Sequence, residues 1–438
     1  MGSSAHPFCL RIVPVAMLKI EFDTYALANG LTVILHPDRS SPLVAVDLWY
    51  HVGSKDESPG RTGFAHLFEH LMFMGSKHAP YPSFDSIMES WGGHNNGTTS
   101  NDRTNYYEIG PRNLLETFLW LEADRLATLP DVITLEELDR QRKVVQNERR
   151  QSYENRPYGA GELVVPEVMY PPEHPYHWPT IGSHADIEAA TVDDVREFFE
   201  RFYRPSNASL SIAGDFDPTT VRGLVDKYFG WQPARPRPER RPPPALPRLE
   251  SDVTRRLTDR VQLPRLRLAW HSPALFAPGD ADMDLAAHVL GGGKSSRLYR
   301  ALVFDGRIAQ DAFAYQGSLM LGSLFHVGAT AKPGHGLEEI TAAVDAQLAR
   351  LASDGPTEEE LARARNTHLA DFYKGLDHLQ TRADLLNHYQ YVLGTPDGAE
   401  RDVDRYRAAT RASVRDAFAQ VLAGKRLAMQ TLPDAVTA

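Results

Sequence analysis

Alternating apolar and polar positions mark the strands expected in the first half of the chain. Residues 44–52 alternate with the strand period of two, and LTVILH precedes them, so we expect these two segments to pair as a hairpin. A second hairpin is expected in HNNGTTSNDRTNYYEIG, with Asn101-Asp102 as its turn. The segment ASLSIAGDF is expected to close this half as a further strand.

Helical spacing of apolar residues predicts the elements between these strands. The segment GFAHLFEHLMFMGS has this spacing, and YPSFDSIMESWGG has it too, with Ser83 as a cap and two glycines at the end. Two long helices are expected, over residues 112–129 and 135–152. Thr191 and Asp194 form a capping pair for a helix that ends near Tyr203.

The second half repeats this order weakly. LRLAWHS predicts a strand, ADMDLAAHVLGGG a helix, AFAYQGSLMLGSLFHVGATA a hairpin, residues 336–393 two or three helices, and RLAMQTL a last strand. We therefore expect an α+β fold with two homologous-looking domains, each a mostly antiparallel sheet with helices packed on one face. Internal duplication is a hypothesis at this point.

A proline-rich segment marks the boundary between the two halves. Seven prolines lie between Pro233 and Pro247, and proline suits neither a helix interior nor a central strand. We expect residues 233–248 to form an extended linker between an N-terminal domain, 1–232, and a C-terminal domain, 249–438.

Composition narrows the function classes. The 438 residues are 42% hydrophobic and 24% charged, as in globular proteins, and the net charge of −10 argues against nucleic acid as a partner. A single cysteine excludes an internal disulfide, and no apolar run approaches the ~18 residues of a membrane span. We expect a soluble protein, cytoplasmic in preference to periplasmic. A remnant export signal in the short apolar run Ile12 to Leu18 is the alternative.

Two histidines and a glutamate share one face of the helix expected near residue 66. An α-helix turns about 100° per residue, so relative to His66 the side chain of Glu69 lies at about −60° and that of His70 at about +40°. Two imidazoles at i and i+4 can coordinate one metal ion, and the glutamate is close enough to reach a water at that metal. The apolar neighbours would bury the other faces.

A catalytic zinc site needs a third protein ligand. Leu138, Gln141, Val145 and Glu148 follow one another at spacings of +3, +4 and +3, so Glu148 falls in register with the apolar stripe of its helix. A carboxylate in that register needs a partner such as a metal. The alternative, a surface salt bridge, stays open on the pattern alone.

With these motifs the chain resembles the inverzincin peptidases, the relatives of pitrilysin, insulysin and mitochondrial processing peptidase. GFAHLFEHLMFMGS is followed by a glutamate 78 residues after the second histidine. The resemblance covers nearly the whole chain past residue 20 and extends through GGHNNGTTSNDRTNYYE, VVQNERRQSYENRPYG, HPYHWPTIGS, FYRPSNASLSIAGDFDP and LGGGKSSRLYRALV. The length matches the small two-domain members of bacterial type, which act as dimers, so the resemblance also implies a bacterial protein.

The resemblance implies that His66, His70 and Glu148 bind zinc and that Glu69 is the general base. In the second half the matching helix reads LAAHVLGGG and keeps only His288, so we expect one zinc per chain.

The resemblance also implies substrate-binding residues. Asn96 would hydrogen-bond the substrate backbone, and the strand through Gly97, Thr98 and Thr99 would offer its edge to an extended peptide. Arg297 and Tyr299 resemble a pair that the second domain supplies to the active site, often from the partner chain. An ordinary helix start after a glycine turn is the alternative for these two.

Two positions depart from the family pattern. Gln141 stands where many relatives carry a second glutamate, so it keeps a hydrogen-bonding end without the charge and is at most a supporting residue behind the ligands. Gly97 replaces an alanine, a change expected to matter little.

LGGGKSS lacks the first glycine of a phosphate-binding loop, with His288 in its place, so nucleotide binding is not expected.

Together these residues predict a zinc-dependent endopeptidase that hydrolyses peptides or unfolded polypeptides. The alternatives are a non-catalytic structural or docking subunit of the same family, and a zinc enzyme with a non-peptide substrate. The expected partners are peptide substrates and either a second copy of the chain or a paralogous subunit.

Overall fold

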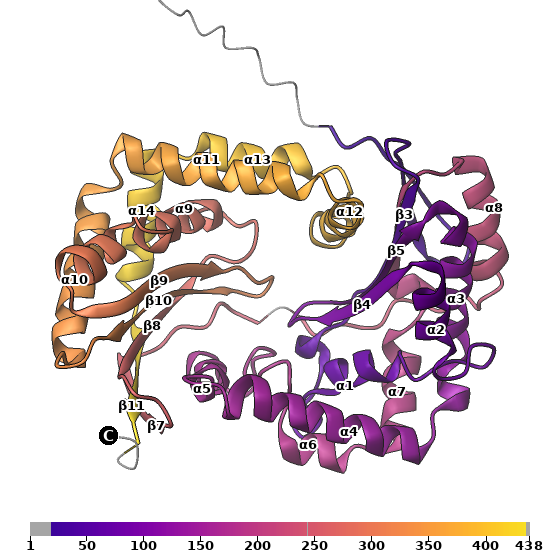
Figure 1. Ribbon diagram of the computed structural model, residues 1–438, viewed down its shortest axis with the longest axis horizontal. Helices are drawn as coiled ribbons and strands as arrows, with labels where there is room; N and C mark the ends of the chain where they lie inside the picture. The colour runs from indigo at the N-terminus through magenta and orange to yellow at the C-terminus, as the bar shows by residue number, and fades with distance from the viewer. Residues whose placement is uncertain (1–18, 243, 435–438) are drawn as a thin grey trace, which may run out of the picture.

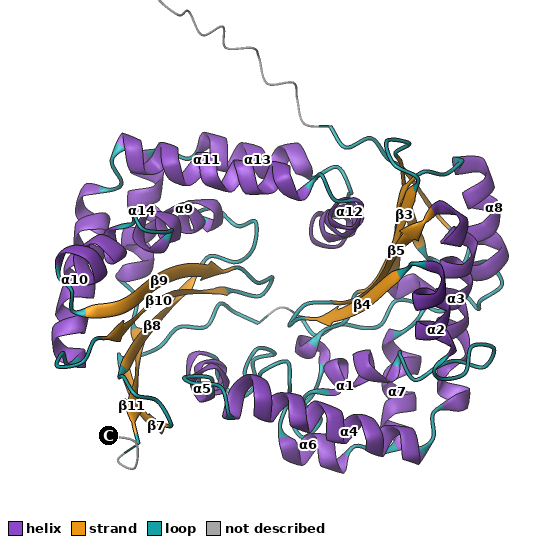
Figure 2. Ribbon diagram, in the orientation of Figure 1, coloured by secondary structure: helices purple, strands orange, loops and turns teal. Residues whose placement is uncertain are grey.

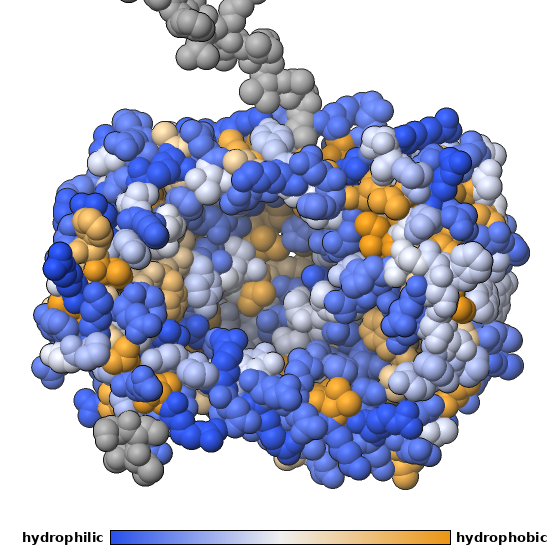
Figure 3. Space-filling view, in the orientation of Figure 1, coloured by the Kyte–Doolittle hydropathy of each residue, from blue (hydrophilic) through white to orange (hydrophobic). Residues whose placement is uncertain are grey.

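The computed structural model describes residues 19–242 and 244–434, which form two sheet-and-helix halves (Figure 1). Each half has one sheet with its helices, as the expected α+β class requires (Figure 2). A hollow lies between the halves in the space-filling view (Figure 3). The run Ile12 to Leu18, considered above as an export signal, lies outside the described residues.

The first sheet has the strand order β1-β2-β6-β3-β5-β4. Its strands are β1 (Asp23–Ala26), β2 (Thr32–Pro37), β3 (Leu43–Tyr50), β4 (His94–Thr99), β5 (Thr104–Pro111) and β6 (Ala208–Gly214). The β4–β5 hairpin was predicted correctly, but the expected hairpin of β2 with β3 is wrong. β6 lies between them, parallel to β2 and antiparallel to β3. All seven residues of β6 are buried, which suits a central strand.

The helices of the first half cover one face of this sheet. They are α1 (Phe64–Leu71), α2 (Ser83–Trp91), α3 (Leu115–Val132), α4 (Leu135–Arg149), α6 (His184–Ala189), α7 (Val192–Phe202) and α8 (Pro218–Phe229), while α5 (Ala160–Met169) lies apart from them. The predicted capping of α7 by Thr191 is confirmed. Ser83 does not cap α2, because it is the first helical residue and its hydroxyl makes no cap bond.

The second sheet repeats the arrangement of the first. Its strands are β7 (Val253–Asp259), β8 (Arg265–Ser272), β9 (Ala309–Gly317), β10 (Ser323–Ala331) and β11 (Arg426–Pro433), in the order β7-β11-β8-β10-β9. As in the first half, the last strand inserts between two earlier ones, parallel to one and antiparallel to the other. This shared topology supports the duplication hypothesis. The helices are α9 (Asp280–Gly291), α10 (Leu337–Asp354), α11 (Glu358–Gly375), α12 (Leu379–Leu393), α13 (Ala399–Ala408) and α14 (Arg411–Leu422).

Each half also lends one helix to the sheet of the other. α12 packs on β3 and β6, where Leu379 and Ala383 meet Ala45 and Ala213. α5 packs on β11 of the second sheet, and Met169 and Met429 share one apolar cluster there. Apolar burial therefore ties the halves together in both directions (Figure 1).

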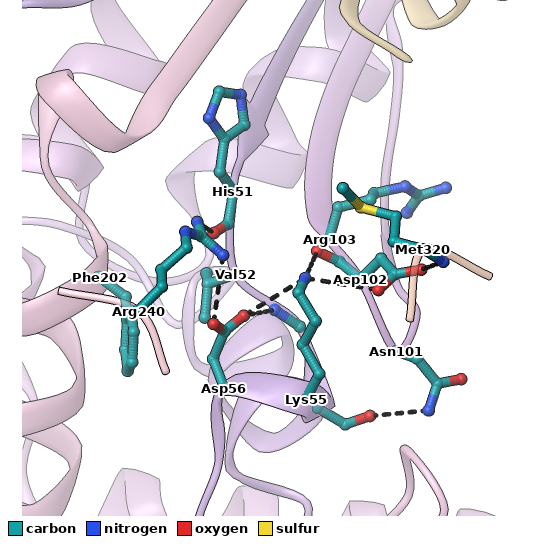
Figure 4. A network of polar contacts seen from close by, with 12 residues as sticks. His51, Val52, Lys55, Asp56, Asn101, Asp102, Arg103, Phe202, Arg240 and Met320 are labelled. Carbon is teal, nitrogen blue, oxygen red and sulfur yellow. Dashed lines mark hydrogen bonds and ion pairs between the residues drawn. The ribbon is translucent and has the colours of Figure 1, made fainter. Parts of the chain in front are cut away.

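Polar contacts join the halves at the turn between β4 and β5 (Figure 4). The carboxylate of Asp102 accepts hydrogen bonds from the amide of Met320, in the β9–β10 turn, at 3.1 Å and from the hydroxyl of Tyr176 at 2.6 Å. Lys55, whose side chain is 8% exposed, lies 3.5 Å from the same carboxylate. It also donates to the hydroxyl of Tyr391 on α12 at 3.0 Å. One turn of the first half thus contacts two segments of the second.

We expect Asp102→Ala to destabilise the protein and to loosen the β9–β10 turn. The substitution leaves Lys55 buried with one carboxylate fewer, and breaking a buried ion pair costs about 3–5 kcal/mol. Asp56 lies 3.5 Å from the same ammonium and would retain part of the compensation, so about 2 kcal/mol is expected. Urea unfolding measures the loss, and hydrogen exchange should quicken in peptides containing Met320. The matched control is Asp371→Ala, at an exposed site on α11; an effect no larger than the control's would contradict the prediction.

Within residues 19–242 and 244–434, no helix is both long and apolar enough to cross a membrane.

Candidate metal centre

The helix that carries the two histidines is anchored at its first turn by a carboxylate from outside the helix. Gly63 precedes α1 with φ +83°, and a Cβ there would lie 2.8 Å from the carbonyl oxygen of Ile181, so glycine is required. Since glycine offers no side-chain cap, Glu57 takes that place and accepts hydrogen bonds from the amides of Gly63 (2.9 Å) and Ala65 (2.8 Å). Burial raises the pKa of Glu57, and the two amide hydrogen bonds oppose this. Sequence periodicity did not reveal this residue.

The opposite face of α1 is part of the first core, as the pattern predicted. The residues expected to be apolar and buried are all at most 4% exposed: Phe64, Leu67, Phe68, Leu71 and Met72. Phe68 packs against aromatic rings of α7 and against Tyr203. This packing fixes the rotation of α1 and turns its polar residues the other way.

His66, His70 and Glu148 meet where α1 packs on α4. One ligand atom from each lies within 4.8 Å of the others, and among the described residues this is the one such group of three or more. Nε2 of His70 is 3.2 Å and Nε2 of His66 is 3.6 Å from the carboxylate oxygens of Glu148. Zinc bonds of about 2.0–2.1 Å at a tetrahedral angle place two ligand atoms roughly 3.3 Å apart. The donor set, and the spacing of each histidine nitrogen from the carboxylate of Glu148, therefore fit a zinc ion.

The charge states of these residues also suit a metal. Burial lowers the pKa of His66 to about 4, so its imidazole is neutral at pH 7, the form that binds a metal. The hydrogen bond from His70 lowers the pKa of Glu148, which favours the carboxylate. The side chain of Glu148 is 38% exposed and those of His66 and His70 are 12% and 22% exposed, so one side of the group remains accessible. Such an open side is typical of catalytic sites.

The chain beyond Glu148 departs from regular α-helix. Residues Arg150–Glu154 form a π-helical turn, a feature frequent at functional sites. Glu154 accepts hydrogen bonds from Arg149 (2.9 Å) and pairs with His184 (2.8 Å). These contacts fix the end of α4 from which Glu148 projects.

Glu69, on α1, directs its side chain toward the end of β4. The hydroxyl of Thr99 donates to its Oε2 at 2.5 Å, and burial raises the pKa of Glu69. A Cβ at position 97 would lie 3.1 Å from Cγ of Glu69 and 3.1 Å from the ring of Tyr106, which is tighter than ordinary contact. Gly97 therefore lies closer to Glu69, the candidate base, than the sequence suggested.

β4 is an edge strand, so one row of its backbone groups is unpaired with any neighbour in the sheet. Asn96 on this strand is exposed, and its Oδ1 accepts a hydrogen bond from the amide of Gly97 at 2.9 Å. The hydroxyl of Thr98 instead donates to Asn105 on β5 at 2.6 Å. The free edge agrees with the expected pairing to an extended peptide.

The remaining candidates lie behind or away from the centre. Gln141 is 5% exposed, and its amide donates to the sulfur of Met74 at 2.9 Å. Arg297 forms a two-point ion pair with Glu360 (2.7 and 2.8 Å), at the start of α11. Tyr299 begins a π-helical segment, Tyr299–Asp305, in the same half. α11 lies in the half opposite α1, so within one chain this pair stands apart from the metal centre (Figure 1).

Comparison with known proteins shows the family of this chain. The model of the insulinase family (peptidase family M16) matches residues 32–169, and that of the peptidase M16 inactive domain matches residues 189–367. The chain belongs to peptidase family M16. Zinc protease PqqE of Helicobacter pylori is 31% identical over 374 residues, which cover 84% of this chain and 83% of PqqE.

Solved structures agree with this assignment. The crystal structure of a protease from Helicobacter pylori is 27% identical, covers 94% of this chain and 99% of its own, and has a TM-score of 0.86. A peptidase M16 inactive domain from Pseudomonas fluorescens is 18% identical, covers 95% of this chain and 98% of its own, and has a TM-score of 0.84. The latter likeness shows the fold alone. The fold of the chain is thus the two-domain M16 fold.

Proposed function

We propose that this chain is a zinc-dependent endopeptidase that hydrolyses peptides or unfolded polypeptides. The observation that carries the proposal is the convergence of His66, His70 and Glu148 beside a buried carboxylate, Glu69, and a free strand edge. Membership of family M16 supports it, as does the likeness to a relative named a zinc protease.

A zinc ion held by His66, His70 and Glu148 would acidify a water molecule and polarise the scissile carbonyl. Glu69 takes the proton of the attacking water and passes it to the leaving amine. Its burial, which raises the pKa of the carboxyl group, makes it a stronger base than an exposed glutamate. Thr99 holds one of its oxygens, and no other residue in the described part of the chain hydrogen-bonds the carboxylate.

The substrate backbone pairs with β4. An extended peptide added to this edge receives main-chain hydrogen bonds that do not depend on its sequence, which suits a peptidase of unfolded chains. Asn96 is exposed on that strand and is available to the substrate backbone. The hollow between the halves offers a place for such a peptide (Figure 3).

Arg297 is not assigned to the reaction within one chain, because Glu360 and the carbonyl of Gly355 already bind its guanidinium. A role for Arg297 and Tyr299 across a dimer remains a prediction. Light scattering on the purified chain decides whether it pairs with a second copy, and an inactive monomer would point to a paralogous partner.

The rival function is a non-catalytic subunit of the same family. The match of residues 189–367 to the inactive-domain model concerns the part of the chain that lacks the metal ligands His66, His70 and Glu148. The presence of those ligands together with Glu69 favours an enzyme. A non-peptide substrate is less consistent with the free edge of β4, and mass spectrometry of the products would distinguish the two.

Metal removal tests the proposal directly. We expect 1,10-phenanthroline to abolish cleavage of fluorescein-labelled casein by the purified chain and zinc to restore it, with one zinc per chain by atomic absorption. Cleavage that survives removal of the metal would contradict a zinc mechanism. A metal-replete chain with no activity, alone or as a dimer, would instead favour the non-catalytic subunit.

A further inference from the structure

Thr99 is the last residue of β4, and its side chain hydrogen-bonds Glu69, the candidate base. Thr99 donates its hydroxyl hydrogen to Oε2 of Glu69 at 2.5 Å. In the described part of the chain this is the one hydrogen bond of Glu69, so Oε1 is left for another partner. The resemblance to known peptidases placed Thr99 among the substrate-binding residues, whereas its hydroxyl is directed to the base.

Gly97 faces the same side chain. Residues 97 and 99 are two apart on a strand, so their side chains point to the same face of the sheet. Absence of a Cβ at Gly97 leaves room for the stem of Glu69, since a Cβ there would approach Cγ to 3.1 Å. Gly97 therefore lies against the stem of Glu69, and Thr99 binds its carboxylate.

A glutamate needs such contacts to act as a base. Ordering a glutamate side chain costs up to about 1.5–2 kcal/mol of rotamer entropy. A catalytic group must be held within roughly 0.5 Å of its productive position. α1 fixes the backbone of Glu69, but no residue of α1 hydrogen-bonds its carboxylate.

We propose that Thr99 is a positioning residue for Glu69: its hydroxyl holds Oε2 so that Oε1 faces the reacting water. β4 then has two roles, because its edge pairs with the substrate while its inner face places the base. The inference rests on the proposed function, since it assigns a base to the same reaction.

The test compares Thr99→Val, which keeps the shape of the side chain and removes the donor, with Thr99→Ser, which keeps the donor. With fluorescein-labelled casein and matched zinc content, we expect Thr99→Val to lower kcat by about 10- to 100-fold, within the range of a general-base contribution. KM should change less than about twofold, and Thr99→Ser should recover most of kcat. A rise in KM with kcat unchanged would make Thr99 a substrate contact and overturn the proposal.

A second measurement does not depend on activity. Crystal structures of the zinc-loaded chain and of Thr99→Val should show the Glu69 carboxylate in one rotamer in the former and in several in the latter, with His66 and His70 unmoved. A single unchanged rotamer in the variant overturns the proposal even if the enzyme is active. Absence of cleavage by the wild-type chain, with the rotamer change present, would instead contradict the proposed function and leave the contact established.

Discussion

Replacing Glu69 with glutamine is expected to abolish cleavage of an unfolded polypeptide while zinc stays bound. Glutamine has the same shape and accepts the hydrogen bond from Thr99 through its carbonyl oxygen, but it cannot take a proton at neutral pH. Loss of a general base costs about 10²- to 10⁴-fold in rate, and here the same group also returns the proton to the leaving amine. The measurement is kcat on labelled casein, with zinc determined by atomic absorption on the same sample.

The matched control is Glu89→Gln, which makes the same change at an exposed position on α2. It should retain wild-type activity and zinc content. Substantial cleavage by metal-replete Glu69→Gln would remove Glu69 from the role of base. Loss of zinc from that variant would show that the glutamate supports the metal site itself.

The two histidines of the candidate metal centre could be predicted from the sequence because their spacing is local. His66 and His70 lie one helical turn apart, so the period of α1 is enough to bring them together. Register with Leu138 and Val145, both buried as that register requires, made Glu148 a candidate, and the family resemblance then implied that it is a ligand. What the pattern could not supply is the contact between α1 and α4, which brings the third ligand to the other two.

Other parts of the site have no periodic signal. Glu57 reaches the first turn of α1 from an irregular segment six residues before Gly63, and nothing in the spacing indicates that contact. The hydrogen bond from Thr99 to Glu69 joins residues 30 apart on a strand and a helix. Such contacts depend on how two elements pack, which hydrophobic periodicity does not encode.

The fold shows the same limit. Alternation located β2 and β3 correctly, yet their pairing was wrong because β6, more than 150 residues later, inserts between them. The exchange of α5 and α12 between the halves was also not predicted. Periodicity indicates which side of α12 is buried, including Ala383 and Leu386, but not that this side covers the sheet of the other half.

Glu148→Ala is expected to abolish stable zinc binding, because two imidazoles remain where three ligands are needed. Loss of a partner that only orients a ligand lowers metal affinity about 10- to 100-fold, so loss of a ligand should lower it by more than about 100-fold. Zinc at 100 times its Kd stabilises a folded protein by about 2.7 kcal/mol, so the wild-type Tm should rise on zinc addition and the variant's should not.

Glu136→Ala serves as the control, since it removes a side chain that is 86% exposed on the same helix. Without zinc, Glu148→Ala should differ little from the wild type in stability, because pairs near the surface are worth at most about 1 kcal/mol. An unchanged zinc content would remove Glu148 from the site and leave it as a polar contact of the two histidines.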